Sequence, residues 1–460
     1  MNFVAGLKRL VLRGVNILSG KAALVLHRPH KSVSPLVDRL LADALRLAEL
    51  PSPAKREERR GAFVTERLIS LGLNPTADEQ GNILVRLSST GIAAEPPLLL
   101  FADLGSRRWH LLESLSRLDA QTARGAGLAD SLGAAALLSL AESAGRLAGT
   151  RDLLLFFAAR SPDDPAENLF CPIIENPENR PFAGIGLRGF ELGKVTTQVR
   201  GLYRMKITLS AFSQAAGGPD RSAAEHSTAV INSLLSTAQM LSGITWDTEG
   251  TTHLHIRRIE AAAAFGKTPA EGVLEIELES TDGKRLDMAM NTVKATVEKA
   301  AAAPGLKAET RITSSIPVGD AAVIAPLSKT VMAVMKEQRI KIREEDGTDL
   351  SAFLSLQGIP AISVGLAAGR EERGRDTIEI ASIGKGRALL EALAARLADD
   401  GTKAVLPSDA KRTTAVILPL VVLPAKTEML PATIAAPIVP AVSLPAVSLP
   451  AVTMLSAGAP

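Results

Sequence analysis

Asp130 lies in a stretch of the sequence that could carry metal chemistry. The stretch is "RGAGLADSLGAAALL" (124–138), in which two closely spaced glycines precede the aspartate and an apolar run follows it. The carboxylate could be a metal ligand at the start of a helix. It could also be the N-cap, because Asp is a preferred N-cap residue and glycines allow the tight turn before it. We predict a helix from Ser131 onward with Asp130 as its N-cap, and a metal role depends on companion ligands.

The histidines and the cysteine supply few such companions. His253 and His255 in "THLHIRRI" lie two residues apart on a predicted strand, so both face the same side. This pair could bind a metal, but Arg257 shares the face and no acidic or cysteine cluster accompanies it in the sequence. We interpret it as a partly exposed strand surface. Cys171 is the single cysteine, which excludes a disulfide within the chain and a zinc site built from several thiolates.

The composition is that of a globular protein. Of the 460 residues 46% are apolar and 22% charged, and the net charge is +3. The basic residues are scattered, and the chain has one Tyr and two Trp. It therefore lacks the clustered charge and the stacking aromatics of nucleic-acid-binding proteins, and we expect no nucleic-acid partner.

Helix and strand patterns alternate through the core of the chain. Residues 35–50 and 56–73 have the apolar spacing of amphipathic helices, and a glycine ends the second. The runs "PLLLFADL" (97–104) and "DLLLFFAA" (152–159) are continuously apolar and of strand length, which suits a sheet covered on both faces. The helix that begins near Ser131 lies between them. This strand–helix–strand order predicts an α/β fold.

Residues 197–312 follow a different pattern. The expected order is a strand at 202–211, a helix at 222–241, strands at 252–260 and 272–280, a helix at 284–302 and a strand at 306–314. The order βαββαβ is that of a ferredoxin-like unit. We therefore predict an α/β domain formed by 35–196 and 313–400, with a ferredoxin-like domain inserted at 197–312.

The two ends of the chain differ from this core. Residues 1–34 form a basic amphipathic segment, which could lie on a membrane surface or pack on the domain. Its apolar run is too short to span a bilayer, and it lacks the order of a signal peptide. We expect a cytoplasmic location, with peripheral membrane association as the alternative. Residues 401–460 are rich in Pro, Ala and Val, with "PAVSL" repeated, and we expect an extended low-complexity tail.

With these elements in order, the sequence resembles the co-catalytic zinc exopeptidase and deacylase superfamily, which includes glutamate carboxypeptidase, tripeptidase and acetylornithine deacetylase. The resemblance covers roughly residues 35–400. "LLLFADLG" falls where the family has a strand ending in His-x-Asp, and "GAGLADSLGAAALL" falls on its glycine-rich Asp-Asp-Lys-Gly segment. "GTDLSAFLSLQGIPAISVG" and "IEIASIGKGRALLEAL" resemble the late motif and the closing helix. The resemblance implies a zinc-exopeptidase-like sheet sandwiched by helices, in which the inserted domain serves as lid or dimerisation domain.

The resemblance also implies positions for two zinc ions, which the family bridges with one carboxylate and a water while a glutamate takes the water's proton. Asp130 has the bridging position. Asp103 has the position of the aspartate that orients the first histidine ligand. Phe101 replaces that histidine, and a phenylalanine offers no lone pair to a metal.

The remaining ligand positions are altered as well. Arg188 stands at the next acidic position, where its charge would repel a dication. Asp163 and Asp164 come three residues late for the catalytic glutamate, although a shifted loop could bring one of them in. Glu372 is a poor substitute for the last histidine. The vestigial cleft is expected to contain Phe101, Asp103, Arg188, Gly347, Thr348 and Asp349.

These losses favour a pseudoenzyme without a bound cofactor, because one surviving carboxylate does not hold a dinuclear zinc centre. Such a protein would hold a peptide-like ligand in the old cleft or pair with a partner. The resemblance makes a homodimer through the inserted domain plausible. The alternative is an active, zinc-dependent amide hydrolase of aminopeptidase, carboxypeptidase or deacetylase type, with a site from Asp130, Asp163 or Asp164, and Glu372. A third hypothesis is a surface-tethered structural protein.

Overall fold

The computed structural model describes residues 34–50, 52, 57–89, 95–105, 116–143, 151–159, 169–211, 223–261, 271–300, 306–372 and 375–405. The expectations for the basic N-terminal segment and for the Pro-rich tail fall outside these residues. Within the described ranges, no helix combines the length and the apolar character needed to cross a membrane.

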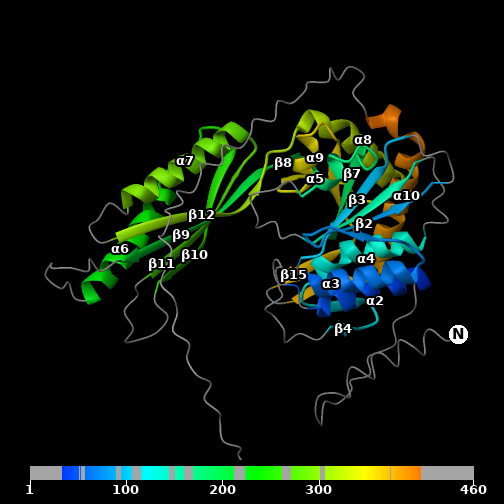
Figure 1. Ribbon diagram of the computed structural model, residues 1–460, viewed down its shortest axis with the longest axis horizontal. Helices are drawn as coiled ribbons and strands as arrows, with labels where there is room; N and C mark the ends of the chain where they lie inside the picture. The colour runs from blue at the N-terminus through cyan, green and yellow to red at the C-terminus, as the bar shows by residue number, and fades with distance from the viewer. Residues whose placement is uncertain are drawn as a thin grey trace, which may run out of the picture. The chain divides into compact units, whose positions relative to one another are not determined.

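An eight-stranded sheet in the order β1-β2-β6-β3-β7-β14-β8-β13 is the largest layer (Figure 1). Its strands are β1 (Thr76–Ala77), β2 (Ile83–Leu87), β3 (Leu98–Asp103), β6 (Leu153–Ala158), β7 (Ala183–Leu192), β8 (Lys194–Val199), β13 (Arg343–Gly347) and β14 (Ala361–Gly365). The central strands β6, β3, β7 and β14 are parallel, and β2 joins β6 antiparallel. The strands β3 and β6 are joined through helix α4, which confirms the predicted strand–helix–strand unit.

Helices cover both faces of this sheet. They are α2 (Pro35–Glu49), α3 (Glu58–Ser70), α4 (Leu128–Glu142), α5 (Cys171–Ile174), α8 (Ala321–Glu337), α9 (Ser351–Ser355) and α10 (Ile380–Val405). Successive residues of a strand point to opposite faces. On β3, Leu98 and Leu100 belong to the main core with α2, α4 and α10, whereas Leu99 and Phe101 belong to a second core with α5 and α9. Both faces are therefore dry, which explains the continuous apolar runs.

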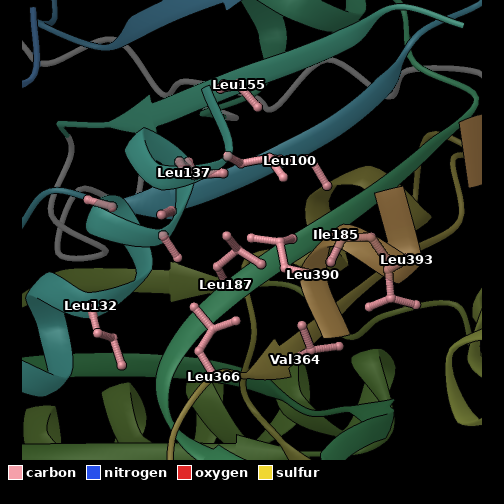
Figure 2. Close-up of a cluster of buried hydrophobic side chains, with 14 of the residues drawn as sticks. Leu100, Leu132, Leu137, Leu155, Ile185, Leu187, Val364, Leu366, Leu390 and Leu393 are labelled. Atoms are coloured by element: carbon pink, nitrogen blue, oxygen red, sulfur yellow. The ribbon is translucent and has the colours of Figure 1, made fainter. Parts of the chain in front are cut away.

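Leucines dominate the main core. The helix α4 contributes residues from every side, because it is buried along most of its length. Figure 2 shows part of this core, with labels on Leu100, Leu132, Leu137, Leu155, Ile185, Leu187, Val364, Leu366, Leu390 and Leu393.

A second sheet comes from the continuous segment between β8 and α8. Its order is β10-β11-β9-β12, and all neighbours are antiparallel. The elements are β9 (Gly201–Ala211), α6 (Ala223–Ser242), β10 (Thr252–Ala261), β11 (Glu271–Ser280), α7 (Gly283–Ala300) and β12 (Leu306–Ile316). The chain order βαββαβ, with the first and third strands in the middle of the sheet, is the ferredoxin-like arrangement that the sequence predicted.

A third, small sheet has the order β15-β16-β5-β4. Its strands are β4 (Arg117–Leu118), β5 (Thr122–Gly125), β15 (Gly369–Glu372) and β16 (Arg375–Glu379). The antiparallel pairing of β16 with β5 places the residues before α4 beside those before α10. The sequence analysis predicted none of these strands, because they are short and mostly charged or polar.

The central strand β7 was also missed, because glycine is depleted in strands. Its three glycines lie where neighbours approach closely. A Cβ atom on Gly186 would lie 2.2 Å from Ser363 Oγ and 2.8 Å from ring atoms of Phe101, and one on Gly189 would lie 1.9 Å from the carbonyl oxygen of Ala129. Packing therefore requires glycine at these two positions.

A pair of helical glycines tests how closely α4 packs on β7. A Cβ atom on Gly133 would lie 2.6 Å from the carbonyl oxygen of Leu187, whereas one on Gly61 in α3 would have only ordinary contact with Ile83, at 3.7 Å. We expect Gly133→Ala to lower the free energy of unfolding by about 2 kcal/mol through overpacking. Gly61→Ala, the matched control, should raise it by about 0.5–1 kcal/mol through helix propensity. Urea unfolding measures both, and a stabilised Gly133→Ala variant would contradict the close approach.

Candidate active site

A cavity lies beside the carboxyl ends of the central parallel strands, where ligand sites of α/β sheets are commonly found. The strand β3 ends in Asp103, and β7 carries Arg188. The polar residues of the α/β part that line the cavity are Glu57, Asp103, Asp130, Arg188, Glu191, Thr348, Asp349, Ser363 and Glu371. Phe101 also lines it. The structure thus brings Phe101, Asp103, Asp130, Arg188, Thr348 and Asp349 to one cavity.

The prediction that Asp130 is an N-cap was wrong. The helix α4 begins at Leu128, its N-cap position is Gly127 with φ 72°, and no side chain of that cap residue bonds to the helix. Asp130 lies in the first turn, where a negative charge interacts favourably with the helix dipole. The N–H of Ala129 instead donates to Oδ2 of Asp376 at 3.0 Å. This partner comes from β16, so local sequence could not reveal it.

Phe101 lies in a buried aromatic cluster. Only 3% of the residue is exposed. Its ring meets that of Phe170 edge-on, with centroids 5.0 Å apart, and Phe156 lies 5.6 Å from Phe170 on the same measure. Leu354 of α9 belongs to the same apolar cluster. The position that the family gives to a ligand histidine is therefore part of the dry second core.

Arg188 is held by the loop before α9. Its Nη2 donates to the carbonyl oxygen of Thr348 and, at 2.9 Å, to Oδ2 of Asp349. Asp349 is 4% exposed. Its Oδ1 accepts hydrogen bonds of 2.8 Å from the N–H of Ser351 and from Oγ of Ser363. These bonds fix the carboxylate, and the carboxylate fixes the guanidinium at the cavity.

A second guanidinium, that of Arg60, lies behind the acidic part of the cavity. Arg60 is 2% exposed and donates from Nη1 to the carbonyl oxygen of Leu104 at 3.0 Å. Burial lowers the pKa of Arg60 to about 10, while the charges of Asp130, Asp103 and Glu57 raise it. Arg60 therefore stays charged at neutral pH and offsets part of the negative charge of these three carboxylates.

The other expected site residues are placed less fully. Gly347 ends β13 and is not among the residues that line the cavity. Glu372 ends β15, but its side chain falls outside the description, and its neighbour Glu371 lines the cavity. Asp163 and Asp164 lie outside the described residues, so their proposed role remains a prediction.

The histidine pair on β10 needs one correction. The rings of His253 and His255 are stacked with centroids 6.3 Å apart. Glu279 and Glu277 lie directly opposite them on β11, so acidic groups do accompany the pair across the sheet. Glu277 is bound by two arginines, Arg204 at 2.8 Å and Arg257.

The residues around the cavity do not fit a dinuclear metal centre. Phe101 has no lone pair and is buried in apolar contacts, and Arg188 brings a positive charge that is fixed in place by Asp349. Across the described ranges, no group of three or more His, Cys, Asp or Glu side chains is arranged to hold a metal ion. A zinc site usually needs three or four protein ligands.

Restoring a histidine at position 101 tests the dry environment of that position. We expect Phe101→His to lower the free energy of unfolding by about 2 kcal/mol at pH 8, because an imidazole would be buried there. Burial keeps the histidine neutral in the folded state, whereas the unfolded chain gains a proton below a pKa of about 6.5. The loss should therefore grow as the pH falls from 7 to 5. Phe101→Leu is the control, and equal pH profiles for both variants would contradict this burial.

The sequence matches no protein-family model. It has no significant match among curated proteins. Solved structures do match the fold. A tripeptidase from Staphylococcus aureus subsp. aureus Mu50 aligns with a TM-score of 0.58 and 16% identity, over 79% of this chain and 98% of that chain. Human carnosine dipeptidase 1 aligns with a TM-score of 0.58 and 12% identity, over 79% of this chain and 97% of that chain.

A third match concerns metal binding in that protein. The YxeP protein of Bacillus subtilis, described as a dinuclear metal-binding peptidase of the M20 family, aligns with a TM-score of 0.51 and 14% identity, over 79% of this chain and 98% of that chain. At these identities the likeness concerns the fold. This chain therefore has the fold of the M20 family of zinc peptidases, the superfamily whose likeness the sequence predicted.

Proposed function

We propose that this chain is a non-catalytic relative of the M20 peptidases that binds a peptide-like ligand in the old cleft. One observation carries the proposal. Phe101 and Arg188, the residues at two expected ligand positions, line the same cavity as Asp130, and each is held by contacts of its own.

The contacts of Phe101 support the loss of a metal. A ligand side chain must present a lone pair toward the cavity, and this ring is packed against Phe170 instead. The glycine at position 186 leaves the space that the ring occupies, since a Cβ atom there would lie 2.8 Å from it. The strand β7 is thus adapted to an aromatic residue at position 101.

The charge of Arg188 supports the same proposal. A guanidinium repels a dication strongly in the low dielectric of a protein cavity. Moving the side chain away would break its ion pair with Asp349, which is buried, and a buried carboxylate without a partner is costly. Metal binding would therefore have to displace a stabilised cation.

A metal assay tests this proposal against the altered-site hydrolase. We expect the purified chain, expressed with zinc present, to contain well below one zinc ion per chain by plasma mass spectrometry. Asp130→Ala should leave that content unchanged, because Asp130 alone cannot hold the metal. A zinc-loaded peptidase of the same fold serves as the positive control. Stoichiometric zinc that Asp130→Ala removes, together with hydrolysis of dipeptides, would overturn the proposal in favour of an active hydrolase.

We also propose that the chain pairs as a homodimer through the segment of β9 to β12. Large apolar side chains on its two helices support this, since Leu235 of α6 is 54% exposed and Met288 of α7 is 70% exposed. We expect light scattering after gel filtration to give twice the chain mass, and Leu235→Lys to shift it toward one chain. A monomeric wild type at micromolar concentration would contradict the pairing.

A further inference from the structure

We propose that Arg188 is the carboxylate-recognition group of the cleft, and that the ligand is a short peptide with a free amino group and a free carboxylate. The inference rests on the proposed function, because it assigns the ligand class of the same cavity. It gives the guanidinium that replaces an acidic ligand position a role of its own.

The guanidinium is preorganised. Two of its bonds, to the carbonyl oxygen of Thr348 and to Asp349, leave from Nη2 alone. The carboxylate of Asp349 is itself fixed by Ser351 and Ser363. A ligand would therefore not have to order this side chain, and preorganisation lowers the entropic cost of binding.

The guanidinium also has donors left over. Its Nε and Nη1 make no hydrogen bond to any part of the chain that the structure describes, and 35% of the side chain is exposed while lining the cavity. Arginine N–H groups in a cavity are well suited to carboxylate, and bonds between charged partners are stronger than neutral ones.

The cavity as a whole favours a ligand with both charges. Within the α/β part, the lining carries Glu57, Asp103, Asp130 and Glu371 in addition to the paired Asp349. One buried cation, Arg60, offsets only part of this charge. A simple anion would be repelled by these carboxylates, whereas an ammonium group on the same ligand would be attracted. A peptide with free ends supplies an ammonium and a carboxylate together.

The test uses dipeptides with matched end groups. A panel combining Gly, Leu, Glu and Lys at both positions is titrated into the full chain by calorimetry, in three forms: free, C-terminal amide and N-acetyl. We expect at least one free dipeptide to bind, and both blocked forms to bind at least about tenfold more weakly. In Arg188→Gln the free peptide and its amide should bind alike.

Arg86→Gln is the matched control. Arg86 has the same exposure pattern in its ion pair with Asp152, 34% and 3% against 35% and 2% for Arg188 and Asp349, but it is absent from the cavity lining. It should keep the preference for the free carboxylate. Failure of every free dipeptide to bind, equal binding of amide and acid by the wild type, or an unchanged preference in Arg188→Gln would each overturn the assignment.

The same titrations separate this inference from the proposed function. Amino-group release from the bound dipeptide is followed after each titration. Hydrolysis would sink the non-catalytic proposal while leaving the carboxylate preference of Arg188 intact. A missing preference without hydrolysis would sink only the role of Arg188.

Discussion

The close approach of β7 to its neighbours is the constraint on which the site depends. Gly186 lets the ring of Phe101 and Oγ of Ser363 lie against the strand, and Gly189 lets the first turn of α4 approach it. This packing places Arg188 opposite Asp349 and turns position 101 into a core residue. Close-packed interiors tolerate little change in volume, so the aromatic cluster and the glycines depend on each other.

Two guanidinium groups carry positive charge around a cavity whose fold relatives include a dinuclear metal-binding peptidase. Arg60 lies behind three carboxylates and bonds to backbone carbonyls, whereas Arg188 faces the cavity and bonds to one buried carboxylate. Carboxylates grouped in a poorly solvated place need compensating charge. An arginine fixed by the protein supplies that charge without open coordination positions, so it can recognise an anion but cannot activate water as a metal does.

Much of the fold could be predicted from local patterns. The apolar runs at β3 and β6 and the alternating strands of the second sheet have clear periods, and the order βαββαβ follows from them. Strand β7 escaped because its glycines serve contacts with residues far along the chain. The N-cap at Asp130 was wrong for the same kind of reason: Asp376 bonds to the start of α4 from 247 positions away in the sequence.

The sequence by itself determined which chemistry was missing. Residue types at positions 101 and 188 are enough to remove a ligand and to add a positive charge, because these properties belong to the side chains alone. Only the tertiary structure decided what those residues do instead. The burial of Phe101 with Phe170, and the ion pair of Arg188 with Asp349 across 161 positions of sequence, arise from strands and loops brought together by the sheet. Such contacts depend on distances in space, which no local pattern records.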